Sequence, residues 1–133
     1  MLTPIDLALL CVAAAPGAMP FELTDDGAHL TLHEGGNPVL VYNYAPVAAS
    51  EQDRARYGEE WSLAAFFHPV YGPDGDVLTE SFPDDHPHHR GGYWAWPRCM
   101  VGDRPLDIWM SKDVCQRHEK WLEKTVTADS VTI

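Results

Sequence analysis

The side chains best suited to chemistry gather at residues 84–96. This stretch holds two carboxylates, three of the seven histidines, an arginine and three large aromatic side chains. Imidazole titrates near neutral pH, so a histidine beside an aspartate can carry a proton with little tuning of its pKa. The glycine pair at 91–92 lets the backbone change direction after the charged half. We therefore predict the site here, with candidate catalytic residues Asp85, His86, His88, His89 and Arg90.

The local backbone decides how these side chains converge. Pro87 biases the preceding residue, His86, toward an extended conformation. In an extended strand, alternate residues share a face. The sequence therefore predicts two faces, one with Asp84, His86 and His88 and the other with Asp85 and His89.

The spacing of His86 and His88 also suits a divalent metal ion, because imidazoles at i and i+2 can converge on one ion with a carboxylate nearby to orient them. A third ligand would come from elsewhere in the chain. The candidates are His68, His118 and Glu119. The sequence leaves the cofactor open, and a metal-dependent enzyme of cupin-like logic is the second hypothesis.

The aromatic half of the stretch favours a different use. Trp94 and Trp96 share a face if the strand continues, and an aromatic platform beside Asp, His and Arg suits a sugar. The sugar ring faces stack on the indoles, and its hydroxyls take hydrogen bonds. Alternatively, these tryptophans belong to the hydrophobic core. We expect this for one of Trp94 and Trp96, and also for Trp61, Trp109 and Trp121. The candidate substrate-binding residues are His68, Tyr93, Trp94 and Trp96.

The cluster also fits a purely structural role, in which Asp and His side chains satisfy the backbone of a loop. The chain has no nucleophile elbow, phosphate loop, dinucleotide fingerprint or HExxH helix. Whether the protein is an enzyme is therefore open. Carbohydrate binding or processing is the first hypothesis, and a non-catalytic structural β domain is the third.

Composition indicates a single globular domain. A chain of 133 residues is long enough for one core and too short for two domains of ordinary size. The formal net charge of -11 opposes nonspecific binding to nucleic acid or to an anionic membrane surface. The expected partner is a small molecule or a carbohydrate, and the oligomeric state is not fixed by the sequence.

The first twenty residues form a separate segment. An apolar run at 7–15 is followed by small residues, as in a secretory signal, but Asp6 and no basic residue precede it. A signal peptide and an apolar segment packed on the domain are both open, and so are an exported (periplasmic or extracellular) and a cytoplasmic location. The run is shorter than the roughly 20 residues of a membrane-spanning helix, so no membrane span is expected.

Residues 21–133 predict one β-rich domain. Alternating segments at 21–24 and 29–33 flank an Asp-Asp-Gly turn, and a third strand at 39–44 follows a Gly-Gly turn, which predicts a meander. Residues 48–60 predict a loop or one short helix. Further strands are expected at 61–68, 77–79, 106–110 and 124–133, with a loop at 98–103.

Short strands joined by Gly and Pro are typical of an antiparallel β-sandwich, so we predict an all-β fold with at most one or two short helices. The last expected strand reaches Ile133 without a closing turn. Because exposed strand edges are usually covered, we expect a fragment truncated at its C-terminus, an incomplete half of a larger sandwich.

Several segments resemble the PmoA-like family of bacterial proteins of unknown function, which carries the label methane oxygenase PmoA. The resemblance covers residues 21–124, rests most on the Asp-His-Pro-His-His-Arg-Gly motif at 85–91, and extends to the segments at 39–44, 67–75, 77–79 and 94–96. It implies an exported β-rich protein about twice this length, often found with carbohydrate-processing enzymes. It does not imply methane oxidation, which would require membrane helices. The chain departs from the family pattern at Gly92 and Tyr93, and its 98–103 loop is irregular.

Overall fold

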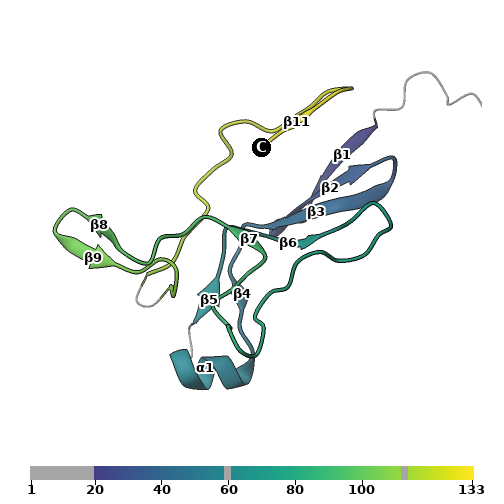
Figure 1. Cartoon of the computed structure of the whole chain (residues 1–133). Coiled ribbons are helices and arrows are strands. Elements are labelled where there is room, and N and C mark those ends of the chain that lie inside the picture. The colour runs from purple at the N-terminus through teal and green to yellow at the C-terminus, as the bar shows by residue number, and fades with distance from the viewer. Residues whose placement is uncertain (1–19, 59–60, 112–113) are drawn as a thin grey trace, which may run out of the picture.

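The computed structural model describes residues 20–58, 61–111 and 114–133 (Figure 1). The predicted N-terminal segment falls on residues 1–19, outside the described part. The largest sheet has five strands in the order β1-β2-β3-β6-β7, and every neighbouring pair is antiparallel. Its strands are β1 Phe21–Asp25, β2 His29–Glu34, β3 Asn37–Asn43, β6 Phe66–Val70 and β7 Gly92–Tyr93.

Three two-stranded sheets and one helix complete the described structure. They are β4 Val47–Ala48 with β5 Ser62–Leu63, β8 Cys99–Val101 with β9 Arg104–Leu106, β10 Thr125–Val126 with β11 Val131–Thr132, and the helix α1 Glu51–Tyr57. The predicted all-β antiparallel fold with at most one or two short helices is confirmed, and the helix is α1. Within the described residues there is one large sheet and no closed barrel.

The predicted meander is confirmed in β1, β2 and β3. The carboxylates of Asp25 and Asp26 accept hydrogen bonds from the backbone N–H groups of Gly27 and Ala28, at 3.1 and 2.8 Å, and so hold the first turn. The register pairs Leu23 with Leu32, so apolar side chains share one face of the sheet.

The hydrophobic core lies where α1, β5 and β6 meet. Trp61, Leu63 and Phe66 are each less than a tenth exposed and form one cluster with Ala49. Phe82 and Tyr93, which flank the histidine-rich stretch, pack against this cluster. The candidate site is therefore anchored at both ends to the best-packed part of the molecule.

Five predicted elements differ from the structure. The strand expected at 77–79 contributes only an isolated bridge between Val77 and Tyr71, and the strand expected at 124–133 is the hairpin β10–β11. The strand expected at 61–68 is split into β5 and β6, because Ala65 takes a positive φ of 60°. The loop expected at 98–103 is a hairpin, β8–β9, which turns at Gly102. The strand expected at 106–110 is mostly a turn, in which the Asp107 carboxylate accepts the backbone N–H groups of Trp109 and Met110, both at 3.0 Å.

The C-terminal segment, residues 114–133, returns to the first hairpin and lies beside the sheet (Figure 1). The Trp121 ring packs edge-on against Tyr44 at 5.3 Å. Asp25 pairs with Lys124 at 3.0 Å and accepts a hydrogen bond from the Tyr44 hydroxyl at 2.6 Å. The bonds from Tyr44 and Lys124 lower the pKa of Asp25 to about 2. In the described residues, no helix is long and apolar enough to span a membrane.

Candidate functional site

The histidine-rich stretch is a closed loop of two consecutive turns. Its ends meet at an isolated β-bridge between Ser81 and Arg90. The first turn has a hydrogen bond from the His86 N–H to the Pro83 carbonyl at 3.1 Å, and the second has one from the His89 N–H to the His86 carbonyl at 2.8 Å. The prediction that this stretch runs extended is wrong.

The proline that suggested an extended strand explains the turn. Pro87 is the second residue of the second turn, where its fixed φ is favourable. The bias that a proline places on the preceding residue is compatible with the first position of a turn. The local preference at His86 is therefore compatible with a chain that reverses immediately after it.

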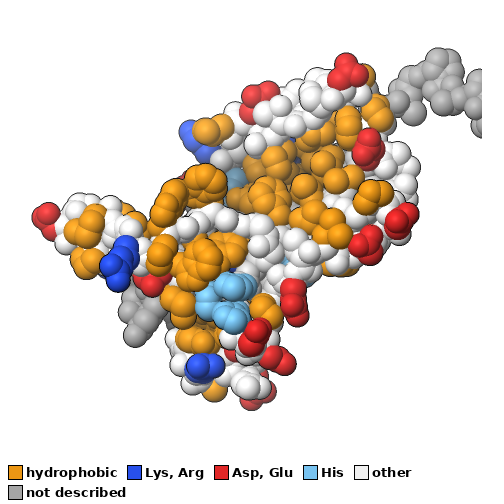
Figure 2. All heavy atoms as spheres, in the orientation of Figure 1, with side chains coloured by type: hydrophobic (Ala, Val, Ile, Leu, Met, Phe, Trp, Pro, Cys, Tyr) orange, Lys and Arg blue, Asp and Glu red, His pale blue; other side chains and the backbone are white. Residues whose placement is uncertain are grey.

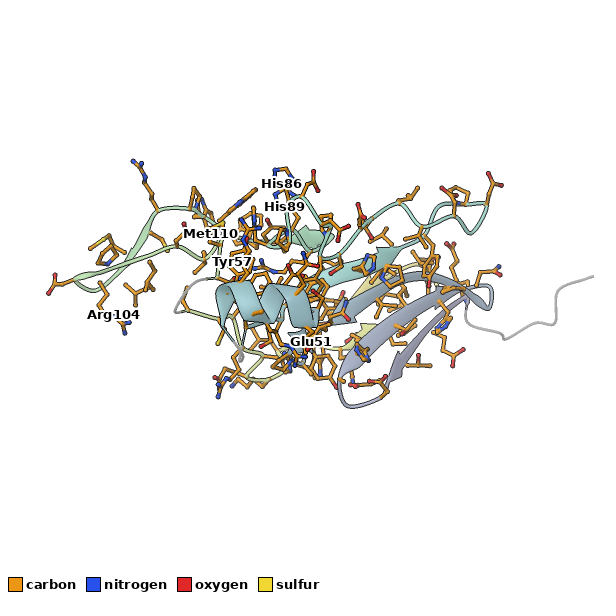
Figure 3. All side chains as sticks on the ribbon, turned by 90° about the horizontal axis from the view of Figure 1, so that it is seen from below. Glu51, Tyr57, His86, His89, Arg104 and Met110 are labelled. Atoms are coloured by element: carbon orange, nitrogen blue, oxygen red, sulfur yellow. The ribbon has the colours of Figure 1, made fainter. Side chains whose placement is uncertain are left out.

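The two turns bring all three imidazole rings into one cluster, so the predicted division into two faces is also wrong. The rings of His86 and His89 stack, with centroids 4.9 Å apart and planes 14° apart. The ring of His88 lies 4.5 Å from that of His89 and 5.9 Å from that of His86. Figure 2 shows a group of histidine side chains at the surface beside hydrophobic ones, and Figure 3 shows His86 and His89 close together on the loop.

The predicted partner Asp85 contacts the cluster at its exposed edge. Its carboxylate lies 3.0 Å from His86 Nδ1. This contact lowers the pKa of Asp85. Because both side chains are more than half exposed, the pair is screened by water and contributes little to stability.

The aromatic partner of the histidines is Trp109. Its ring lies edge-on to His89 at 5.6 Å, and it is also 5.6 Å from the ring of Tyr93. Trp109 was expected in the core, yet it is 37% exposed. No local spacing identifies it, since twenty residues separate it from His89. The sequence signal that could have indicated its position is Asp107, an aspartate two residues earlier, whose carboxylate accepts the Trp109 N–H and forms a turn.

Trp94 and Trp96 lie apart from the histidine rings. They pack edge-on against each other at 5.2 Å and are 71% and 50% exposed, so the expectation that one of them belongs to the core is wrong. Of the aromatic contacts between described residues, none joins either tryptophan to a histidine ring. The indole that lies beside the histidine rings is therefore that of Trp109, not that of Trp94 or Trp96.

A groove of about 350 Å³ opens beside the histidine cluster. Its polar lining residues include His89 and Glu80, and its aromatic lining residues are Tyr93 and Trp109. The full lining is Leu78, Thr79, Glu80, Pro83, His89, Gly91, Tyr93 and Trp109. His68 does not line the groove, but its Nδ1 lies 3.0 Å from the hydroxyl of Thr79, which does.

Arg90, predicted as a catalytic residue, lies beneath the loop with only 1% of its surface exposed. Its guanidinium donates hydrogen bonds to the His88 carbonyl at 3.3 Å and to the Gln116 side-chain oxygen at 3.1 Å, and it stacks over the Tyr93 ring at 4.0 Å. Burial lowers the pKa of Arg90 and raises that of Tyr93. Arg90 is therefore a positioning residue that connects the loop, β7 and the C-terminal segment.

Two histidines make the stability of the fold depend on pH. Burial lowers the pKa of His68, and burial together with the neighbouring His89 and His86 lowers the pKa of His88. The unfolded chain therefore takes up these protons more readily than the folded chain. The stabilisation is fully present above the unfolded pKa of 6.5 and is lost as pH falls below it.

We accordingly expect the free energy of unfolding to decrease as pH is lowered from 7.5 to 5. Urea unfolding at several pH values measures the effect. His88→Gln and His68→Gln should each reduce the slope below pH 6.5, because each removes one group that the unfolded state protonates more readily. A slope unchanged in both variants would contradict this origin.

The metal hypothesis gains no third ligand from the structure. In residues 20–58, 61–111 and 114–133, no group of three or more His, Cys, Asp or Glu side chains is arranged to hold a metal ion. His118 packs against Tyr44 and Trp121, with ring centroids at 5.0 and 4.4 Å, and does not join the cluster. A metal at His86 and His88 stays a prediction. Metal analysis of protein purified without a tag tests it.

Comparison with known proteins identifies a family without assigning an activity. No curated protein and no solved structure matches this chain. Residues 29–133 match a family of unknown function (DUF6807), and this span includes the histidine loop, Trp109 and Gln116. The family description carries no function, so the resemblance to PmoA-like proteins stays a prediction. Because the match covers most of its length, the chain belongs to the DUF6807 family.

Proposed function

We propose that this protein binds a carbohydrate in the groove beside the histidine cluster. The observation that carries the proposal is the position of Trp109, a partly exposed indole that lines the groove together with the imidazole of His89. Carbohydrates present apolar ring faces and many hydroxyls, so their sites combine aromatic surfaces with a few fixed polar groups.

The polar groups of the groove suit hydroxyl recognition. Glu80 supplies acceptors, Thr79 supplies a hydroxyl, and the ring of His89 can donate from one nitrogen and accept at the other. A net charge of -11 favours a neutral sugar over an acidic one. The resemblance to PmoA-like proteins, which often occur with carbohydrate-processing enzymes, supports the same ligand class.

The groove also contains groups for acid-base chemistry on a bound sugar. His89 and Glu80 border the same space, and imidazole exchanges protons near neutral pH. We assign the proton-carrying role to His89 and not to Arg90, because Arg90 is buried and already donates to two acceptors. Asp85 contacts only the outer histidine, His86, of the cluster.

A glycan array of neutral sugars, followed by calorimetric titration of those bound, tests the proposal. Trp109→Ala should weaken binding about tenfold, since it removes a stacking surface. Trp96→Ala is the matched control, because Trp96 is half exposed and does not line the groove. Circular dichroism of both variants checks that the fold is retained. Absence of binding to any neutral sugar by the unmodified protein would refute the proposal.

A further inference from the structure

A second, larger groove of about 700 Å³ lies between the sheet and the C-terminal segment. The sheet contributes Tyr42 and Phe67, whose rings pack at 4.9 Å, and the C-terminal segment contributes Trp121. Trp94 lines the groove and is 71% exposed. Polar side chains accompany these rings, so the groove is not a purely apolar surface; they include Gln116, His118, Lys120 and Glu123.

The two grooves meet at the edge strand β7 from its two sides, because the register pairs Phe67 with Gly92 and Phe66 with Tyr93. Tyr93 lines both of them, and the preceding glycines divide between them, with Gly91 in the histidine groove and Gly92 in the larger one. Glycine leaves backbone accessible to a ligand, because it has no side chain to cover the peptide. Figure 2 shows a group of histidines and a broad hydrophobic surface on the same face of the molecule.

The segment that carries Trp94 is fixed to the histidine loop through a chain of hydrogen bonds. The Gln116 side-chain N–H donates to the Trp94 carbonyl at 2.9 Å, and the Gln116 oxygen accepts from Arg90 at 3.1 Å. Arg90 in turn donates to the His88 carbonyl at 3.3 Å. An exposed tryptophan in one groove is therefore held in a set position relative to the histidines of the other, as a site for one extended ligand requires.

We propose that the ligand is an oligosaccharide whose consecutive units occupy both grooves, with one unit against Trp109 and a later unit against Trp94. This inference rests on the proposed carbohydrate function and specifies its substrate class. Each groove offers an indole together with polar residues. An indole can stack on the apolar face of a sugar ring, and polar groups can form hydrogen bonds with its hydroxyls. A repeating chain of rings matches two such sites joined at Tyr93 better than a single small molecule does.

The test compares affinities for short and long sugars by calorimetry. The probes are neutral linear glucans, xylans and mannans of one to six units, screened first on an array. In the series that binds, we expect the hexasaccharide to bind about tenfold more tightly than the monosaccharide. Trp94→Ala should reduce this ratio to below about threefold, whereas Trp109→Ala should lower both affinities together. Met100→Ala, which removes an exposed apolar side chain outside both grooves, should keep the ratio.

The outcomes separate the two proposals. Equal affinities for short and long sugars, with binding retained, would overturn the oligosaccharide inference and leave the carbohydrate function standing. A gain with length that Trp94→Ala does not reduce would also overturn the inference, because another surface would then bind the additional units. Binding of no neutral sugar of any length would overturn both proposals.

Discussion

Replacing Gly91 by alanine is expected to lower the free energy of unfolding by about 3 kcal/mol or more. Gly91 has a φ of +59°, which alanine adopts only with strain. A Cβ at this position would also collide with the backbone carbonyl of Phe67 in β6. Backbone atoms cannot rotate away as a side chain can, so relief requires β7 to separate from β6. Urea unfolding followed by tryptophan fluorescence measures the loss.

Gly35→Ala is the matched control for this substitution. Gly35 has almost the same φ, +58°, but a Cβ there would meet no atom within 4 Å. Its substitution should cost only about 1 kcal/mol, the price of the left-handed backbone alone. The difference between the two variants is then the cost of the collision with Phe67. If both variants lost the same stability, β6 and β7 would not be packed as closely as the structure shows.

Arg90→Ala is expected to lower the free energy of unfolding by about 3 kcal/mol. The substitution removes a side chain that is 99% buried, leaving a cavity beneath the histidine loop and the Gln116 oxygen without its donor. It also removes the stacking of the guanidinium on Tyr93. The same urea unfolding measurement applies, and any sugar binding should weaken with the loss of order in the loop.

Two further variants divide this effect into its parts. Arg90→Met keeps much of the buried volume and should recover more than half of the lost stability. Gln116→Ala removes one partner of the guanidinium and should cost about 1 kcal/mol. A methionine variant as unstable as the alanine variant would show that the polar contacts of Arg90, and not its packing, hold the loop to the sheet.

The sequence was sufficient for elements that depend on short-range signals. The meander β1–β3 follows from alternation of apolar residues and from Asp and Gly in its turns. Residues 48–60 leave a loop and one short helix both open, and the structure has the helix α1, which begins after Ser50, whose hydroxyl accepts the Asp53 N–H. The gathering of chemistry-bearing residues at 84–93 was also visible without the structure.

The sequence was not sufficient where distant residues decide the arrangement. The residues at 84–89 are compatible both with an extended strand, which would separate the histidines onto two faces, and with two turns, which cluster them. The bridge between Ser81 and Arg90 closes the loop and so favours the turns. The replacement of Trp94 by Trp109 as the aromatic partner of His89 depends on a contact across twenty residues. The burial of Arg90 depends on Gln116, which is further still along the chain. A single sequence contains no record of such pairings.

The link between Asp25 and Lys124 sets an order of assembly for the chain. These residues are 99 positions apart, whereas the strands of the meander pair with their nearest neighbours in sequence. Contacts between distant residues carry the larger cost of loop closure, so the meander is expected to form first and the C-terminal segment to dock last. Gln116 arrives with that segment, and Arg90 gains this partner only then. The larger groove, which this segment walls, is therefore completed in the final step of folding.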